Sequence, residues 1–329
     1  MSNEFILEVK SLKKYFQAGR AGLFSRDDGN IVHAVDGVDL QLKPGEVIAL
    51  VGESGCGKST LSLTLMGLEE ATEGQIFFEG IDITHATNEE RKKIRQKIQM
   101  IFQDPYESLN PTQTIEEIVT EPLLVHGLAR DPHERKERVR RALEDSGLKP
   151  AESYMKRFPH QLSGGQRQRV VIAGALVLEP ILLLADEPVS MLDVSIRAEI
   201  INLLADLRKS RGISVIFITH DLGTVGYFAD RVAVMYMGRI VEIGSMREVL
   251  KDPKHPYSHA LLSVIPVPNP RLRKKRIILQ GETPSPIHIP SGCRFHPRCP
   301  VALDKCKQSD PQLIKINDQH EAACLLLLK

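Results

Sequence analysis

Residues 47–60 read VIALVGESGCGKST, an apolar run that passes directly into a glycine-rich segment. The apolar run predicts a buried strand over 47–51, and the residues from Ser59 to Leu68 have helical spacing. Between them, Gly52 to Ser59 matches the GxxxxGK(S/T) pattern of a phosphate-binding loop. In such a loop backbone N–H groups surround a phosphate, Lys58 reaches the β- and γ-phosphates, and the Ser59 hydroxyl ligates Mg²⁺. A glycine turn that matched by chance would lack the flanking strand and helix, so the stretch predicts a nucleotide site.

The remaining apolar runs predict an α/β architecture. Strands are expected over 5–10, 181–184 and 214–219, and helices over 89–98, 131–146, 170–178 and 193–210. Strands that are apolar throughout and separated by helices indicate a parallel sheet covered on both faces. A loop from Gly19 to Asn30, rich in glycine and acidic residues, is expected to be exposed.

A second signal for a site is the sequence ILLLADE at 181–187. The apolar strand brings Asp186 to its polar end, where a carboxylate can hold Mg²⁺ directly or through water. Glu187 follows at once and could polarise an attacking water as a general base. Taken alone, the same residues fit equally well a core strand that ends in a solvated acidic turn.

Three further signals are weaker when taken from the residues alone. The sequence LSGGQ at 162–166 places Ser163 as a helix N-cap before two glycines, which indicates either an anion site or an ordinary helix start. Gln103 follows a strand-like run, and His220 ends the apolar run SVIFITH. A histidine at the end of a strand is more often structural than catalytic.

Composition excludes several classes of protein. The 329 residues include 43 Lys and Arg against 42 Asp and Glu, and this near-balance argues against a protein whose main partner is nucleic acid. The most apolar region, 170–185, is interrupted by Glu179 and Pro180 and is shorter than the roughly 20 residues of a membrane-spanning helix. The N-terminus carries Glu4 and Glu8 and lacks an apolar signal core. A cytoplasmic protein is expected, associated with a membrane only through partners.

The C-terminal part differs in composition from the rest. Ten of the 20 prolines lie between Pro253 and Pro300, which predicts an irregular, extended connection over 250–292 that includes the basic run at 271–276. Cys56 stands alone, whereas Cys293, Cys299, Cys306 and Cys324 all fall in the last 37 residues. In a reducing compartment such a group suggests a metal site more than disulfides. Their wide spacing favours an iron–sulfur cluster, with zinc as the alternative and simple packing of thiols as the plainest explanation.

Taken in order, these motifs resemble those of the ATP-binding cassette (ABC) ATPases. Gly52–Ser59, Gln103, Leu162–Gln166, Asp186–Glu187, Asp193 and His220 resemble the phosphate loop, Q-loop, signature, Walker B pair, D-loop and switch histidine of that family. The resemblance implies catalytic roles for Glu187, His220 and Gln103, and Mg²⁺ ligation by Ser59, Gln103 and Asp186. It implies that ATP is bound by Phe16 (with Tyr15 as the fallback for stacking on adenine), Gly52, Ser54, Gly55, Cys56, Gly57, Lys58, Ser59, Thr60, Ser163, Gly164, Gly165 and Gln166.

A narrower resemblance covers nearly the whole chain. The segments GESGCGKST, QDPYESLNP, LSGGQRQR, ADEPVS and HPYSHALL (255–262), with the four late cysteines, are similar to the ATPase subunits of dipeptide and oligopeptide permeases. It implies a cassette over 1–250 with a helical subdomain at about 104–165, and a Pro-rich extension over 251–329 that holds a 4Fe–4S cluster on its cysteines. The same subfamily includes nickel and oligosaccharide importers, which stay open as alternative cargoes.

The resemblance also implies partners. These are a second, related cassette in a head-to-tail heterodimer, two membrane permease subunits that contact the region from Gln103 to about Tyr154, and an extracytoplasmic substrate-binding protein. The chain is then expected to be peripheral on the cytoplasmic face of the membrane. A cassette that acts on nucleic acid or the ribosome is the alternative of another class, but such proteins commonly carry tandem cassettes or coiled coils, and neither pattern is present.

Two positions depart from the family pattern. Met191 stands where the D-loop usually has alanine, and Gly174 stands where the helix after the signature commonly has arginine. Neither change removes a catalytic group, so they bear on assembly and turnover rate.

Overall fold

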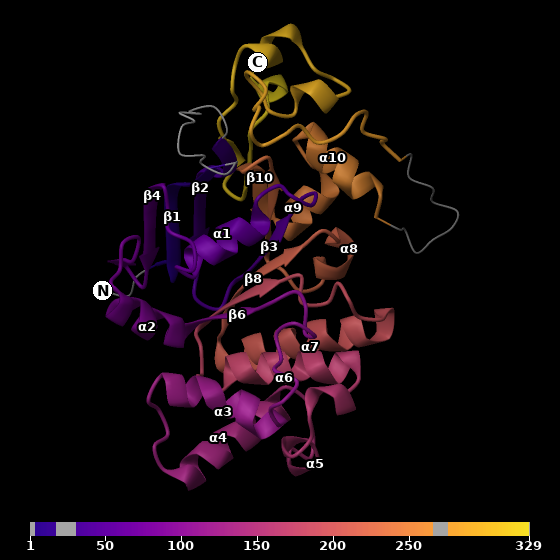
Figure 1. Cartoon of the computed structure of the whole chain (residues 1–329). Coiled ribbons are helices and arrows are strands. Elements are labelled where there is room, and N and C mark those ends of the chain that lie inside the picture. Colours follow the sequence, from indigo (N-terminus) through magenta and orange to yellow (C-terminus); the bar gives the residue numbers. More distant parts are fainter. Residues whose placement is uncertain (1–3, 18–30, 266–275, 329) are drawn as a thin grey trace, which may run out of the picture. The chain divides into compact units, whose positions relative to one another are not determined.

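The computed structural model describes residues 4–17, 31–265 and 276–328 (Figure 1). The chain divides into two compact units. The first comprises 1–43, 48–85 and 219–329, and the second comprises 44–47 and 86–218. The loop expected to be exposed, from Gly19 to Asn30, and positions 271–275 of the basic run lie outside the described residues.

The first unit contains an antiparallel sheet with the strand order β2-β1-β4-β5. Its strands are β1 (Leu7–Gln17), β2 (Ile31–Leu42), β4 (Glu73–Phe78) and β5 (Ile81–Asp82). In β1, Leu7, Val9 and Leu12 are buried, and Leu7 pairs with Leu42 of β2 and with Phe78 of β4. A register shift between Val9 and Leu12 bends the strand, as expected of a bulge.

A second sheet begins with β3 (Val47–Val51), which pairs in parallel with β9 (Arg231–Tyr236). Antiparallel pairing then continues through β10 (Arg239–Ser245), β12 (His320–Ala322) and β11 (Ile314–Asn317). β9 and β10 are joined by Met237 and Gly238, both with positive φ, at 44° and 80°. Two positive φ values are what a tight type I′ hairpin turn requires. The helices of this unit are α1 (Lys58–Leu65), α8 (Leu222–Val225), α9 (Met246–Lys251) and α10 (Pro256–Ser263).

The second unit combines a parallel sheet with a group of helices. β6 (Ile98–Ile101), β7 (Leu182–Asp186) and β8 (Ser214–Thr219) pair in parallel in the order β6-β7-β8, and all five residues of β7 are buried. The helices are α2 (Asn88–Lys97), α3 (Ile115–Val125), α4 (Pro132–Asp145), α5 (Glu152–Met155), α6 (Gly164–Leu176) and α7 (Val194–Arg211), with a short 3₁₀ turn at Pro159–Gln161. Helices α3 to α6 share an aliphatic core around Val119, Leu143 and Val170, and Figure 1 shows them gathered together.

The sequence defines the starts of these helices locally. Thr87, Thr114 and Ser163 are the N-caps of α2, α3 and α6, and each accepts a hydrogen bond from the backbone N–H three residues later. In all three cases a Glu or Gln at that position bonds back to the cap residue, which completes a capping box. Gly212 closes α7 in the left-handed conformation, at φ 67°.

Two of the predicted features are corrected by the structure. The sheets are mixed, because β1, β2, β4 and the strands from β9 to β11 pair in antiparallel fashion. The stretch predicted to be irregular over 250–292 contains the helix α10, which begins at Pro256. Proline is tolerated at the first helical position, where its missing N–H would have no partner within the helix. Beyond α10 the described extension consists of loops, β11, β12 and the short 3₁₀ turns His296–Arg298, Asp304–Lys307 and Leu325–Leu327. Among the described residues, no helix is long and apolar enough to cross a membrane.

Candidate functional site

The phosphate loop lies between β3 and α1, in the first unit. Its shape depends on glycine: a Cβ at Gly52 would lie 2.2 Å from the Met235 carbonyl oxygen, and one at Gly57 would lie 2.0 Å from that of Ala34. Gly57 also has φ +104°, which side chains rarely permit. As the N-cap of α1, Gly57 has no side chain to occupy the first N–H groups of the helix. These groups are therefore available to an anion.

Lys58 lies folded against its own loop. Its Nζ donates hydrogen bonds to the carbonyl oxygens of Gly52 and Glu53, each at 2.9 Å, and lies 3.7 Å from Cys56 Sγ. Burial raises the pKa of the Cys56 thiol despite the neighbouring ammonium group, so the thiol stays protonated at neutral pH. The ammonium group thus has a fixed position beside the backbone that would receive the phosphates.

The other predicted phosphate-loop residues are open to a ligand. Ser54, Gly55 and Ser59 are exposed, and nothing lies within 4 Å of the position that a Cβ of Gly55 would occupy. Thr60 is partly buried and accepts the hydroxyl hydrogen bond of Thr64 through its carbonyl oxygen. The loop therefore exposes a hydroxyl group and backbone on one side and is packed on the other.

Of the two aromatic candidates for adenine, Tyr15 is already engaged. Its hydroxyl donates to Asp36 Oδ1 at 2.5 Å, and its ring lies 4.3 Å from the ring of His33. Burial and the bond to the Asp36 carboxylate raise the pKa of Tyr15. Phe16 is half-buried, and the Lys14 ammonium lies 4.6 Å from its ring centroid. Phe16 therefore stays the predicted adenine contact, with Tyr15 as the fallback.

The predicted Walker B and Q-loop residues meet in the second unit. Asp186 ends β7 and is buried, and Gln103 Nε2 donates to Glu187 Oε2 at 3.2 Å. Glu187 has φ +45°, and its N–H bonds to the Ile218 carbonyl oxygen at 3.0 Å while its own carbonyl accepts from Ser190. Backbone strain of this kind at a polar residue is typical of functional sites.

The predicted signature segment forms the start of α6. The Ser163 hydroxyl accepts from the Gln166 N–H at 3.3 Å, and the Gln166 side chain accepts from the Ser163 N–H at 3.1 Å. Gly165 packs so closely on α7 that a Cβ would lie 2.6 Å from Ile196 Cγ2, whereas Gly164 has more space. Gly164 and Gly165 thus leave the backbone at the start of the helix uncovered by side chains of their own.

The remaining predicted residues are distributed between the units. His220 comes directly after β8, is exposed and belongs to the first unit. Asp193 is the N-cap of α7 and belongs to the second unit. Met191 is 55% exposed, and nothing lies within 4 Å of a Cβ built on Gly174. The structure thus places both departures from the family pattern where a larger or different side chain causes no clash within the second unit.

The prediction of a metal site on the cysteines is wrong. In the described parts of the chain, no group of three or more His, Cys, Asp or Glu side chains could hold a metal ion, which removes both the iron–sulfur cluster and zinc. The cysteines share one short segment of the chain, and that alone was not sufficient to predict a set of metal ligands. Burial raises the pKa of Cys293 to about 11 and also raises the pKa of Cys299 and Cys324.

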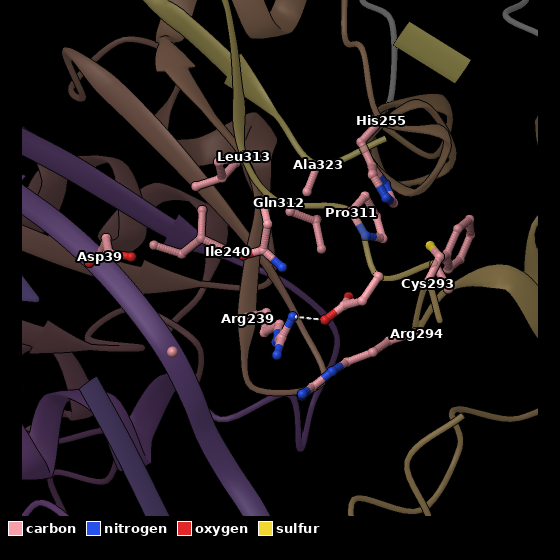
Figure 2. Close-up of a pocket in the computed structure, with 14 residues that line it drawn as sticks. Asp39, Arg239, Ile240, His255, Cys293, Arg294, Pro311, Gln312, Leu313 and Ala323 are labelled. Atoms are coloured by element: carbon pink, nitrogen blue, oxygen red, sulfur yellow. Dashed lines mark hydrogen bonds and ion pairs between the residues drawn. The ribbon is translucent and has the colours of Figure 1, made fainter. Parts of the chain in front are cut away.

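A cavity of about 180 Å³ lies beside the extension in the first unit (Figure 2). Arg239 pairs with Asp310, and Arg294 pairs with Asp36. His255, which also lines the cavity, is buried, and burial lowers its pKa to about 3. Since both arginines already have carboxylate partners, the cavity presents no uncompensated charge from them.

Two residues that contact the phosphate loop were missed by the sequence analysis. The Glu53 N–H donates to the Tyr257 hydroxyl at 2.8 Å, and Arg298 forms an ion pair with the Glu53 carboxylate at 2.7 Å. Tyr257 belongs to the segment HPYSHALL, which in the sequence indicated only a resemblance to peptide-permease ATPases. Nothing in the local sequence around Arg298 indicates a contact with a residue 245 positions away.

The predicted magnesium ligands fit that ion by their chemistry. Ser59, Gln103 and Asp186 offer a hydroxyl, an amide and a carboxylate oxygen, and Mg²⁺ prefers oxygen ligands. The cradle formed by Gly52 and Gly57, whose Cβ positions are already filled by backbone, likewise suits a phosphate group.

Comparison with known proteins gives concordant matches. A family model described as ABC transporter matches residues 35–190, and one described as oligopeptide/dipeptide transporter, C-terminal region, matches residues 241–306. The chain is 48% identical to the oligopeptide transport ATP-binding protein AppF of Bacillus subtilis, over 99% of this chain and 98% of that protein. It is 46% identical to the dipeptide transport ATP-binding protein DppF of Haemophilus influenzae, over 98% and 97% of the two chains.

Solved structures with a similar fold include two cassettes. The dimeric, post-hydrolysis ATP-binding cassette MJ0796 bound to ADP and Pi has a TM-score of 0.64 and 32% identity, covering 73% of this chain and 99% of that one. The protein cbiO1 from Clostridium perfringens, part of the ABC transporter complex cbiONQ, has a TM-score of 0.65 and 33% identity, covering 76% and 92%.

Proposed function

The chain belongs to the ABC transporter family, as an ATP-hydrolysing subunit, and from this premise we propose that it powers the import of dipeptides or oligopeptides. The match of residues 241–306 to the C-terminal region of oligopeptide and dipeptide transporters carries this proposal. It is supported by near full-length similarity to proteins named for oligopeptide and dipeptide transport. The cassette would span 1–250, with its helical subdomain at about 104–165, and residues 251–329 would form the Pro-rich, four-cysteine extension.

The proposed division of labour follows the chemistry of the residues. Lys58 and the loop from Gly52 to Thr60 bind the phosphates, and Phe16 stacks on the adenine. Glu187 orients the attacking water and accepts its proton, while Gln103 holds the Glu187 carboxylate through its amide. His220 contacts the terminal phosphate. Bound Mg²⁺, held by Ser59, Gln103 and Asp186, would neutralise charge on the phosphates.

We propose that hydrolysis requires a second, related cassette. In this assembly Ser163, Gly164, Gly165 and Gln166 of one subunit close over the terminal phosphate held by the other. The lack of side chains at Gly164 and Gly165 and the favourable dipole of a helix N-terminus support this role. The dimeric state named for the cassette MJ0796 supports pairing in general, and for this chain we propose a heteromeric pair.

The membrane partners would dock on the second unit. Tyr106, Leu124 and Val125 expose more than half of their surface, and they lie within the region from Gln103 to Tyr154. A groove of about 940 Å³, lined by α3 and α4 residues such as Thr120 and Arg135, lies in the same region. Two permease subunits would occupy this surface and hold the chain peripherally on the cytoplasmic face of the membrane. An extracytoplasmic binding protein would deliver the cargo.

The cargo is tested by transport in the assembled complex. The complex would be purified through a tag on this chain, reconstituted into vesicles, and given labelled dipeptides, oligopeptides, oligosaccharides or nickel ions. ATP-dependent uptake of peptides, lost in the Glu187→Gln complex, is the expected result. Uptake of nickel or oligosaccharide in place of peptides would overturn the proposed cargo while leaving the ATPase assignment intact.

A further inference from the structure

Glu53, the second residue of the phosphate loop, forms hydrogen bonds through its N–H, its carbonyl oxygen and its carboxylate. Its N–H donates to Tyr257 Oη at 2.8 Å, and its carbonyl oxygen accepts from Lys58 Nζ at 2.9 Å. Its carboxylate accepts from both terminal nitrogens of Arg298, at 2.7 and 3.1 Å, and from Thr283 Oγ1 at 2.8 Å. The carbonyl oxygen also accepts from the Cys56 N–H at 3.3 Å. Every polar group of this loop residue therefore has a partner, and Tyr257, Thr283 and Arg298 belong to the C-terminal part of the chain.

The groups that hold Glu53 are themselves fixed. The Arg298 side chain is only 8% exposed, and its two-pronged contact with a carboxylate is the geometry that gives charge-assisted hydrogen bonds their strength and direction. Burial alone would raise the pKa of Glu53, but the bonds from Arg298 and Thr283 hold it below its ordinary value. Glu53 is therefore ionised at neutral pH, so the ion pair is present under physiological conditions.

Tyr257 is anchored by an aromatic cluster. Its ring is fully buried and lies 4.7 Å from the ring of Tyr236 and 5.4 Å from that of Phe295. Phe295 is three residues before Arg298, so the same short segment packs against the tyrosine and reaches the carboxylate. The contacts of Glu53 with Tyr257 and with Arg298 thus both depend on the position of residues 294–298.

The same segment has a second set of contacts within the first unit. Arg294 pairs with Asp36 and donates to the Met237 carbonyl oxygen at 2.5 Å. Asp36 in turn accepts the hydroxyl of Tyr15, next to Phe16 on β1. The segment 294–298 is therefore joined both to the phosphate loop and to the strands that carry the proposed adenine contact.

We propose that Arg298 is a positioning residue for ATP binding. It holds Glu53, and the Glu53 carbonyl in turn holds the Lys58 ammonium that contacts the phosphates. The C-terminal extension thus fixes the part of the phosphate-loop backbone that holds the Lys58 ammonium group. This inference rests on the assignment of residues 52–59 to the ATP phosphates.

The test measures ATP affinity of the full chain and the KM and kcat of the assembled complex. Arg298→Gln and Glu53→Gln should each weaken ATP affinity and raise the KM for ATP by about tenfold, as loss of charge-assisted hydrogen bonds predicts. The kcat at saturating ATP should change by less than about twofold, because neither residue contacts the reacting atoms. The double variant should be no worse than either single variant, because one interaction is removed in all three.

Control variants distinguish a failure of the role proposed for Arg298 from a failure of the phosphate-loop assignment. Arg247→Gln, which changes an exposed arginine on α9, should bind ATP like the parent. Lys58→Ala should lose ATP binding, and parent-like binding by that variant would overturn the phosphate-loop assignment itself. If Arg298→Gln fails to fold, Thr283→Val still removes one bond to Glu53 and should raise the KM by about twofold. Parent-like KM in the folded Arg298 and Glu53 variants, additive losses in the double variant, or a fall in kcat instead of a rise in KM would overturn the inference.

Discussion

The backbone at Glu187, the proposed general base, has a strained conformation. A φ of +45° costs a non-glycine residue about 1 kcal/mol or more, and the cost is met by bonds from the Glu187 N–H to Ile218 and from Ser190 to the Glu187 carbonyl. The turn that results follows the last residue of β7 immediately, so the carboxylate stands at the end of a buried strand with the Gln103 amide beside it. A side chain held in this way loses little freedom when it orients a water molecule.

Replacing Glu187 by glutamine should separate binding from hydrolysis. The amide keeps the size of the side chain but cannot accept the proton of water, so turnover by the complex should fall at least about 100-fold. ATP affinity should stay within about twofold, because Lys58 and the phosphate loop are unchanged. Single-turnover hydrolysis and equilibrium ATP binding measure the two quantities. Near-parent hydrolysis in the assembled complex would show that another group is the general base.

At the scale of elements, α6 contains two glycines with opposite surroundings. A Cβ on Gly174 meets nothing within 4 Å, whereas a Cβ on Gly165 would lie 2.6 Å from Ile196 Cγ2. Gly174→Ala should therefore raise the free energy of unfolding by about 0.5–1 kcal/mol, because alanine is the better helix former. Gly165→Ala, the matched control in the same helix, should lower it. Urea denaturation followed by circular dichroism measures both, and destabilisation by Gly174→Ala would mean that this surface is packed in solution.

Helix α10 gives the first unit a defined dependence on pH. His255 caps this helix through Nδ1, and burial lowers its pKa to about 3 from the ordinary 6.5. Between these values the unfolded chain binds more protons than the folded one, so stability is lost as the pH falls below about 6.5. The contribution of this residue to the unfolding free energy should fall by about 2 kcal/mol between pH 7 and pH 5.

His255→Asn should remove that part of the pH dependence, because asparagine can also cap a helix but does not titrate. Chemical denaturation at several pH values measures the slope. His133→Asn, at an exposed position on α4, serves as the control and should leave the slope unchanged. An unaltered slope in His255→Asn would show that this histidine is not the group responsible.

The sequence predicted elements where one local pattern dominates. β3 over 47–51 and β8 over 214–219 match their predicted bounds, because the first is apolar throughout and the second is apolar between Ser214 and Thr219. β1 extends to Gln17, beyond the predicted 5–10, because its pairing with β2 continues to Gln17 although the residues after Leu12 are only partly buried or exposed. α10 was missed because prolines were taken as breakers, although Pro256 occupies the first helical position.

At the scale of the whole molecule, motifs locate residues but do not show which distant residues meet. The pairing of Gln103 with Glu187 joins two predicted residues, 84 positions apart. The pairing of Glu53 with Arg298 was not predictable, because 245 residues separate them and only the fold brings them together. The prediction for the cysteines was wrong for the opposite reason: they are near one another in the sequence, yet in the described residues they form no metal site.

The central claim is that this chain is one ATPase subunit of a larger importer, and its most direct test is the ATPase rate at successive levels of assembly. The lone chain, the pair of cassettes and the complete membrane complex would be assayed at equal concentration, each with its Glu187→Gln counterpart as the blank. The rate per chain should be lowest for the lone chain and highest for the complete complex, because the proposed site is completed by the partner cassette and its closure is favoured by the membrane subunits. Equal rates at all three levels would contradict the account.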